Sequence, residues 1–525
     1  MIPLVLIFAL AQVAPLSEAQ KAAPGLLKKV PTEGSLVYVT LDDGTEQWAI
    51  KQADGLLTPL DKKAFKPPKK DKDGKGDFQP GTNVTLDCDL NADGLCTPTT
   101  GNVTVVGASL AALTTPGIYQ RVLVMIQDYS ICGYPPGVNE STTRSLFLGP
   151  NGDGTGGIAQ KYTQCSYGKF NLNATEFRVV TVPQTTCSTA ITATCSWWAI
   201  SGTSDTATKA LLGSVAFASF THYIYIVPPG LPCPWSGLAL LPGNQVWLQT
   251  TDNGVYRWAT VMQEALHNYG LWHSWRNGVE YDDYSTAMGR GDACPNAAEI
   301  SRMGWATPAP GGGAISSASF APGSALAFVL PATYLTGDGN YLRVVPDWLP
   351  TYNNNNTLAK NLYIAVRVAN GPDAGLSAAY APMMHVHEVN ATMDNGYPTS
   401  YATSDRKITI ISTIPSLGRA NLTAYNLVVY GGSWASTDVM RVYLCRYTTS
   451  PSQCPGLGAI EVPPPPPAPK PPSPRAPANP SPRPPTPRPS PRPPPPRLPP
   501  SSKPPPPSPR RPPPLKVVGR RQLLG

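Results

Sequence analysis

The sequence predicts a mixed α/β (α+β) fold in which one amphipathic helix lies among many short strands, followed by a proline-rich tail. Three observations lead to this expectation. Apolar residues recur at helical spacing between residues 256 and 270. Short runs rich in β-branched and aromatic residues, bounded by Gly, Pro and Asn, occur on both sides of that segment. Proline then fills 31 of the 52 positions from 463 to 514.

The predicted helix has one continuous apolar face. Its members follow the i, i+3, i+4, i+7 spacing and are Trp258, Val261, Met262, Ala265, Leu266 and Tyr269. Gly270 follows the last of them, and a glycine at that position commonly ends a helix.

The predicted strands fall into three groups, which define three regions of the chain. They occupy 36–41, 83–86 and 102–106, then 121–126, 223–227 and 246–248, and finally 325–330, 362–368 and 426–430. We therefore expect a signal peptide at 1–19, a β-rich N-terminal region and possible propeptide at 20–115, a catalytic domain at 116–307, a β-rich, sandwich-like region at 308–460 and a basic Pro-rich tail at 461–525.

The tail carries the positive charge of the chain. Residues 463–525 contain 12 Lys and Arg and no Asp or Glu, and because all 525 residues together carry +8, the remainder carries −4. This division argues against a basic nucleic-acid-binding domain, so no nucleic-acid partner is expected. The repeated Ser-Pro and Pro-Arg-Pro units predict a disordered tail in extended polyproline II conformation, which acts as a stiff spacer.

Several features indicate export. Residues 2–15 are mostly apolar but shorter than the ~20 residues that span a bilayer, and Ser17-Glu18-Ala19 fits a cleavage site. No later segment is a transmembrane candidate. Ten cysteines without a CxxC pair suggest up to five disulfides, with 88–96, 187–195 and 445–454 as plausible local pairs. Seven Asn-x-Ser/Thr sequons predict a glycoprotein, at Asn83, Asn102, Asn139, Asn173, Asn355, Asn390 and Asn421.

The helix also carries a metal-binding pattern. Residues 263–273 match H-E-x-x-H-x-x-G-x-x-H at every defined position except the first, where Gln263 replaces His. Gln263 and His267 are four residues apart and share one helix face, so both can reach one metal. Gly270 lets the backbone leave the helix sharply, which allows His273 to return as a third ligand. Glu264 lies next to the first ligand and is the candidate general base toward a water molecule.

Met288 lies 15 residues after His273, in the segment Tyr284-Ser285-Thr286-Ala287-Met288-Gly289. A Met in a tight turn beneath the metal accompanies this motif in metzincins. Met288 is therefore predicted to form the floor of the site.

These residues resemble the gametolysin family of green-algal extracellular-matrix metallopeptidases, which are metzincins. The similarity lies in the segments 165–171 (CSYGKFN), 233–239 (CPWSGLA), the helix 256–273 and 282–289, and extends over roughly residues 116–460. The resemblance implies a secreted endopeptidase that cleaves hydroxyproline-rich matrix or cell-wall glycoproteins. The tail resembles hydroxyproline-rich wall glycoproteins, so it is expected to associate with wall polymers. Some members of the family resemble this chain in carrying Gln at the position of Gln263.

Zinc is the expected metal, and copper is the second choice because it leads the affinity order for nitrogen and oxygen sites. The alternative function is a non-catalytic structural matrix glycoprotein built on an inactive protease fold. An intact Glu264 favours the enzyme, because a binding module has no need of a general base.

Three further patterns suggest other sites. The segment Asp89–Gly94 resembles the start of a calcium loop but has Thr100 at its twelfth position, so an Asx-rich turn is favoured. His385 and His387 could chelate a metal from one face of a strand. Cys88 or Cys96 could act as a propeptide thiolate on the active-site metal.

Overall fold

The structure is a computed structural model, and it describes residues 28–41, 44–67, 80–91, 93–99, 103–107, 117–354, 358–396 and 406–461. The chain divides into two units, Met1–Val462 and Pro463–Gly525. The predicted signal peptide and the tail from 462 onward lie outside the described residues. Among the helices described, none combines the length and the apolar character that a membrane crossing requires.

The N-terminal region is a six-stranded sheet with the order β3-β2-β1-β4-β5, in which β6 also pairs with β4. Its strands are β1 (Lys28–Thr40), β2 (Glu46–Lys51), β3 (Leu57–Pro59), β4 (Asn83–Leu90), β5 (Cys96–Pro98) and β6 (Thr104–Gly107). The strands predicted at 36–41, 83–86 and 102–106 are thus confirmed, apart from Asn102, which lies outside the described residues. Leu36, Ile50, Val84 and Leu86 form its small core.

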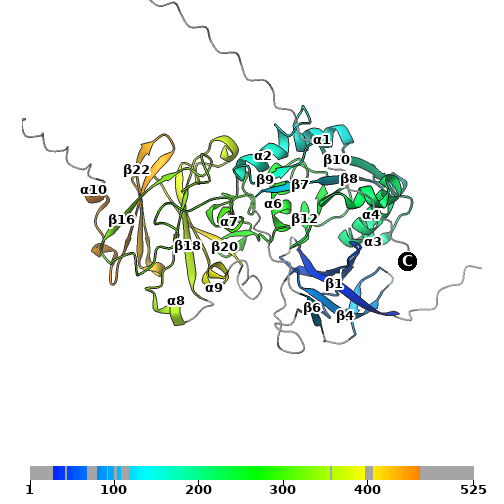
Figure 1. Cartoon of the computed structure of the whole chain (residues 1–525), viewed down its shortest axis with the longest axis horizontal. Helices are drawn as coiled ribbons and strands as arrows, with labels where there is room; N and C mark the ends of the chain where they lie inside the picture. Colours follow the sequence, from blue (N-terminus) through cyan, green and yellow to red (C-terminus); the bar gives the residue numbers. More distant parts are fainter. Residues whose placement is uncertain are drawn as a thin grey trace, which may run out of the picture. The chain divides into compact units, whose positions relative to one another are not determined.

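The central region contains a five-stranded sheet with the order β10-β8-β11-β13-β12, labelled in part in Figure 1. Its strands are β8 (Val122–Asp128), β10 (Arg178–Pro183), β11 (His222–Val227), β12 (Gly237–Ala239) and β13 (Gln245–Gln249). All neighbours pair in parallel except β12, which is antiparallel to β13. The predicted strands 121–126, 223–227 and 246–248 are confirmed here.

Helices cover both faces of this sheet. Because side chains alternate along a strand, Val124 and Ile126 of β8 enter one core and Leu123 and Met125 enter another. The first core is covered by α1 (Glu140–Leu148), α2 (Gly157–Cys165) and α6 (Trp258–His267), and the second by α3 (Thr189–Thr192), α4 (Trp197–Leu212) and α5 (Ser214–Ala218). A short parallel pair, β7 (Ile118–Gln120) and β9 (Phe170–Leu172), lies beside the first core.

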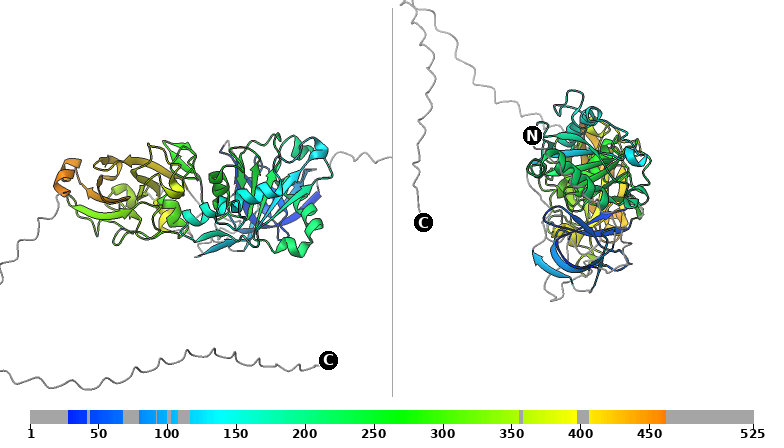
Figure 2. Two further views of the ribbon diagram at one scale, coloured as in Figure 1. Left: turned by 90° about the horizontal axis from the view of Figure 1, so that it is seen from above. Right: turned by 90° about the vertical axis from the view of Figure 1, so that its right-hand side faces the viewer.

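The C-terminal region is a sandwich of two sheets with the orders β15-β14-β20-β19-β18-β17 and β16-β23-β22-β21. Its strands are β14 (Ser274–Arg276), β15 (Val279–Glu280), β16 (Ala325–Pro331), β17 (Tyr341–Val344), β18 (Lys360–Arg367), β19 (Met383–Asn390), β20 (Ile408–Ile414), β21 (Arg419–Leu422), β22 (Leu427–Ser436) and β23 (Val439–Arg446). Inward side chains from both sheets form one core, which confirms the predicted sandwich; Figure 2 shows its strands in green to orange.

Short helices connect these strands. They are α7 (Ala297–Arg302), α8 (Pro350–Asn354), α9 (Ala391–Asn395) and α10 (Leu457–Ile460). The strands β14 and β15 come from the segment before the predicted boundary at 307, and β14 pairs in parallel with β20. The sheet of the C-terminal region therefore begins at the residue that follows His273.

All ten cysteines form disulfides. The local pairs Cys88–Cys96 and Cys445–Cys454 are confirmed. The predicted pair 187–195 is wrong, because Cys187 bonds to Cys132 and Cys195 to Cys233. Cys132 and Cys187 follow β8 and β10, neighbouring parallel strands whose carboxyl ends meet. The propeptide-thiolate hypothesis is likewise wrong, since Cys88 and Cys96 bond to each other.

The sequons differ in their exposure. Asn139 and Asn421 are exposed, whereas Asn390 is buried and its side chain accepts a hydrogen bond from the backbone NH of Met393. Asn102 and Asn355 lie outside the described residues. A glycan at Asn390 is incompatible with this burial, while glycosylation at the exposed positions stays a prediction.

Candidate metal centre

The helix α6 holds the candidate residues in a buried setting. Every residue from Ala259 to His267 is buried, so the helix passes through the core with its polar residues inside as well. Its end has the geometry of a Schellman motif: Leu271 N–H donates to Leu266 O and Gly270 N–H donates to His267 O. Gly270 has φ of 89°, a left-handed conformation that favours glycine. This turn directs the chain back so that His273 faces His267.

The two histidines face each other through their Nε2 atoms, which are 3.0 Å apart. Each Nδ1 lies against an acceptor, Leu271 O at 2.7 Å for His267 and Glu280 Oε1 at 2.8 Å for His273. An Nδ1–H that donates to such an acceptor leaves the Nε2 lone pair free on each ring. Burial lowers the pKa of His267 to about 3, with His273 nearby adding to the effect, and burial also lowers the pKa of His273. Both rings are therefore neutral and suited to metal binding.

This arrangement fits a bound cation. The Nε2 atoms are 3.0 Å apart, so their two lone pairs repel unless a positive centre lies between or beside them. Two nitrogens on a tetrahedral zinc, with bonds of ~2.0–2.1 Å, lie roughly 3.3 Å apart, close to the distance seen here. Gln263 is 8% exposed, lines the same cavity, and its amide has no partner among the described residues. Two imidazoles and an amide oxygen thus form a plausible donor set, although no group of three His, Cys, Asp or Glu side chains gathers within the described ranges.

Glu264 lies beside these donors, against the edge of the central sheet. It is 4% exposed and lines the cavity. A Cβ atom added to Gly237 of β12 would be 2.7 Å from Glu264 Oε1, so only glycine leaves room for the carboxylate at this place. The candidate base is therefore held between its own helix and the edge strand.

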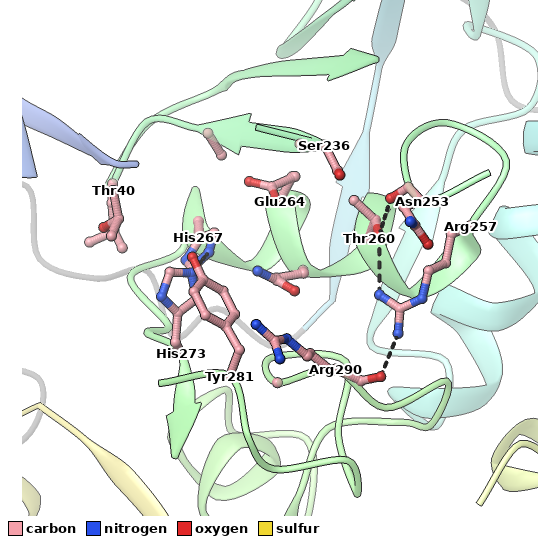
Figure 3. Close-up of a pocket in the computed structure, with 15 residues that line it drawn as sticks. Thr40, Ser236, Asn253, Arg257, Thr260, Glu264, His267, His273, Tyr281 and Arg290 are labelled. Carbon is pink, nitrogen blue, oxygen red and sulfur yellow. Dashed lines mark hydrogen bonds between the residues drawn. The ribbon is translucent and has the colours of Figure 1, made fainter. Parts of the chain in front are cut away.

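These residues share a cavity of about 400 Å³, shown in Figure 3. The figure shows that Glu264, His267, His273 and Tyr281 face a common space, that the Arg290 side chain extends toward Tyr281, and that Arg257 lies farther away beside Thr260. The residues that line it are Thr40, Ser236, Gly237, Ala239, Leu241, Asn253, Arg257, Thr260, Gln263, Glu264, His267, His273, Tyr281, Gly289 and Arg290.

Met288 is fully buried in the loop that follows β15. Its carbonyl accepts from Ser274 N–H at 2.9 Å, so the Met288 loop is attached directly to the residue after His273. Asp283 anchors the same loop, because it accepts from the Ser274 hydroxyl at 2.7 Å and from the Ser285 hydroxyl at 2.6 Å. The structure thus joins the backbone of Met288 to the residue after His273, while the role of Met288 as the floor of the site stays a prediction.

Protein groups lie against the Nε2 atoms of His385 and His387, and metal chelation by this pair stays a prediction. His387 Nε2 lies 3.1 Å from Asp283 Oδ2, and His385 Nε2 lies 2.6 Å from Tyr380 O. Burial would raise the pKa of Asp283, but its hydrogen bond and charge interaction with His387 and the bonds from Ser285 and Ser274 lower it to about 2. A strand of the C-terminal sandwich therefore supports the Met288 loop through the contact between His387 and Asp283, which is buried on both sides.

The calcium-loop segment forms an Asx turn. Asn91 Oδ1 accepts from Asp93 N–H at 3.0 Å and from Leu95 N–H at 2.9 Å. Ala92 and Thr100 lie outside the described residues. The side chain of Asn91 is thus used within the turn, which agrees with the alternative that the sequence favoured.

Several residues at the site are absent from the sequence prediction. Glu280 orients His273, the Tyr281 ring packs on His273 at a centroid distance of 3.9 Å with the planes tilted by 38°, and Arg290 and Thr40 line the cavity. A carboxylate that orients a ligand histidine is a common companion of metal sites. The position of Glu280, seven residues after His273, was therefore a weak sequence signal of its role. Thr40 had none, because it arrives from the N-terminal sheet.

The mixed sheet, the buried helix with its facing histidines and the adjoining methionine loop are the features expected of a peptidase of the type predicted from the motif. The sequence profile described as gametolysin peptidase M11 matches residues 121–424, more than half of the chain. The chain therefore belongs to the gametolysin peptidase M11 family.

A curated relative supports this assignment. Autolysin from Chlamydomonas reinhardtii is 31% identical to this chain over 210 residues. The aligned part covers 35% of this chain and 33% of autolysin, so the similarity spans about a third of the relative's length.

Proposed function

We propose that this protein is a secreted, metal-dependent endopeptidase in which Gln263, His267 and His273 hold the metal and Glu264 is the general base. The observation that carries the proposal is the pair of neutral imidazoles whose Nε2 atoms face each other at 3.0 Å. Beside them lie a buried carboxylate and an amide that has no partner within the described ranges. Zinc is the metal proposed, because borderline nitrogen and oxygen donors suit it, and copper is the second choice.

The chain's own residues supply the proton transfer and the orientation. A bound metal would act as a Lewis acid toward the substrate carbonyl and the attacking water. Glu264 would accept the proton of that water at its carboxylate and pass it to the leaving amine. Glu280 and the Leu271 carbonyl keep the two imidazoles in the tautomer that presents Nε2. Gln263, Glu264, His267 and His273 are each between 4% and 8% exposed, which limits their contact with bulk water.

The edge strand supports an extended peptide as substrate. The strand β12 is the last member of its sheet, and Gly237 brings its backbone against Glu264. A peptide that pairs with such an edge presents its backbone carbonyls at a constant spacing. Matrix or cell-wall glycoproteins are the substrates we propose, because the family is that of gametolysin and the relative is named an autolysin. The Pro-rich tail would hold the enzyme near such polymers.

The test combines metal analysis with two matched variants. The secreted full-length protein should contain about one equivalent of zinc, and chelation should abolish hydrolysis of a wall glycoprotein fraction. Glu264→Gln removes the base and keeps the donors, so the metal should stay while kcat falls by ~10²–10⁴. Glu176→Gln, an exposed carboxylate outside the cavity, is the control and should leave kcat unchanged.

A protein that binds metal and wall polymers but hydrolyses nothing would instead favour the non-catalytic matrix glycoprotein. The presence of Gln263 in place of the motif histidine is the feature that favours this second function. Unaltered hydrolysis by Glu264→Gln would contradict the proposed mechanism while leaving peptidase activity intact.

A further inference from the structure

The loop after Met288 holds Arg290 in a fixed place at the cavity wall. Arg290 N–H donates to Asp283 O at 3.1 Å, and Gly291 N–H donates to Thr286 O at 3.0 Å. A Cβ atom at Gly289 would meet Asp283 O at 2.0 Å, and one at Gly291 would meet Tyr284 O at 2.3 Å. The two glycines thus permit a tight turn that a larger residue on either side of Arg290 would break.

Arg257 fixes this turn from the helix side. Its Nη2 donates to Arg290 O at 3.0 Å and to Gly291 O at 2.9 Å, while its Nη1 donates to Thr260 Oγ1 at 3.2 Å. The charge of Arg257 is balanced by Asp292, whose Oδ1 lies 2.7 Å from its Nε. Figure 3 shows the bonds from Arg257 to Thr260 and to Arg290. Four of the five N–H groups of Arg257 are thus engaged and its charge is balanced by a neighbouring carboxylate, so its main role is to hold the turn.

Arg290 differs from Arg257 in that its charge is not balanced. Its side chain is exposed, lines the cavity, and makes no hydrogen bond or ion pair with any described residue. Figure 3 shows its guanidinium directed into the same space that Tyr281, His267 and Glu264 face. A guanidinium held by a rigid backbone at the wall of a cleft is suited to a carboxylate, which it can bind through two parallel hydrogen bonds.

The carboxylate would come from the peptide chain that the cleft accepts. A peptide paired with β12 turns alternate side chains away from the strand, and those on one face enter the cavity between β12 and the Met288 loop. We propose that Arg290 forms a subsite for an acidic side chain of the substrate, so that this peptidase prefers Asp or Glu at one position beside the cleaved bond. The proposal rests on the proposed peptidase function and names a substrate class within it.

The experiment uses full-length enzyme and matched fluorogenic peptides that differ only in Glu, Gln or Lys at each position flanking the cleaved bond. For wild type we expect kcat/KM to be about 10- to 100-fold higher for Glu than for Gln at one position, the range of a hydrogen bond to a charged group. Arg290→Gln should remove this preference, and Arg290→Glu should reverse it in favour of Lys. The preference of wild type should also shrink as salt rises, because the cavity is open to screening ions.

Arg178→Gln is the matched control, because Arg178 is also exposed and its side chain has no partner among the described residues, but it lies on β10 outside the cavity. It should keep the full preference. Equal rates on Glu and Gln peptides for wild type, or an unchanged preference in a folded Arg290→Gln, would overturn the subsite. Cleavage favoured only by neutral glycosylated peptides would overturn it as well. No hydrolysis of any peptide by wild type would reject both this subsite and the proposed function.

Discussion

The amide of Gln263 is the one donor that departs from the motif, and its chemistry can be tested directly. An amide oxygen is a weaker donor than imidazole toward zinc or copper. Residue 263 lies one helical turn before His267 on the same face, so the substitution Gln263→His should complete a three-histidine site. We expect tighter metal retention in a graded chelator series, with kcat kept within roughly tenfold, a barrier change of ~1.4 kcal/mol. Loss of metal at the same chelator strength in both proteins would mean that Gln263 is not a ligand.

Glu299 makes the stability of the molecule depend on pH. It is fully buried, and burial raises its pKa to about 8 in spite of hydrogen bonds from Thr286 and the Asn296 backbone. In the unfolded chain a glutamate has a pKa of ~4.3. Between that pH and about pH 8, the folded state therefore keeps a proton that the unfolded state has lost. Stability conferred by the neutral carboxyl is therefore present at about pH 4 and is lost as the pH rises toward 8.

Glu299→Gln keeps an amide in place of the neutral acid and removes this titration. We expect the melting temperature of wild type to fall between pH 5 and pH 8 more steeply than that of Glu299→Gln, measured by thermal unfolding. Glu176→Gln, an exposed carboxylate, serves as the control and should follow wild type. Parallel curves for wild type and Glu299→Gln would show that Glu299 is ionised in the folded protein throughout this range.

At the scale of the elements, the end of α6 decides where His273 lies. Gly270→Ala forces a side chain into a backbone with φ of 89°, which costs roughly 1–2 kcal/mol of stability. It should also loosen the metal, because the turn sets the distance between His267 and His273. Gly202→Ala is the control, since Gly202 lies inside α4 with open space around its Cα and should gain ~0.5–1 kcal/mol. Unfolding curves and chelator titrations of both variants test this. A Gly270→Ala protein as stable as wild type would argue against the capping role.

The helices show why some elements were predictable and others were not. The helix α6 was found from sequence because its buried stripe consists of large apolar residues. The longest helix of the central region, α4, has a buried face that includes Ser201, Ser204, Asp205 and Thr208. Polar residues on the buried face remove the hydrophobic period on which prediction depends. Gln127 hydrogen-bonds Ser204, and Tyr225 hydrogen-bonds Asp205, so tertiary partners bind two of these polar side chains.

At the scale of the whole molecule, the Pro-rich tail is expected to contribute to location and not to folding. A chain that ends at Val462 retains every described sheet and all five disulfides. It should therefore unfold at the same temperature and cleave a small peptide at the same rate as the full chain. It should lose retention on an isolated cell-wall fraction, measured by sedimentation. Equal retention with and without residues 463–525 would reject wall association by the tail.

The sequence by itself determined the pieces of the site that are close together along the chain. Gln263, Glu264, His267, Gly270 and His273 lie within one helix and its exit, where helical geometry alone relates one residue to the next. Of the three local cysteine pairs predicted from short separation, the two with separations of 8 and 9 residues are confirmed, and the third, 187–195, is wrong. The tail and most strands could also be recognised from the sequence, because a local period or composition is enough to identify them.

Only the tertiary structure decided what the distant parts contribute. His387 reaches Asp283 across 104 positions, Thr40 borders the cavity from another sheet, and Cys165 bonds to Cys294 across 129 positions. Arg290 carries no motif of its own, and the role proposed for it rests on a turn that holds its charge without a partner among the residues that the structure describes. Such contacts arise from the packing of strands and sheets far apart in the chain, and no local pattern of residues records which distant partner each one meets.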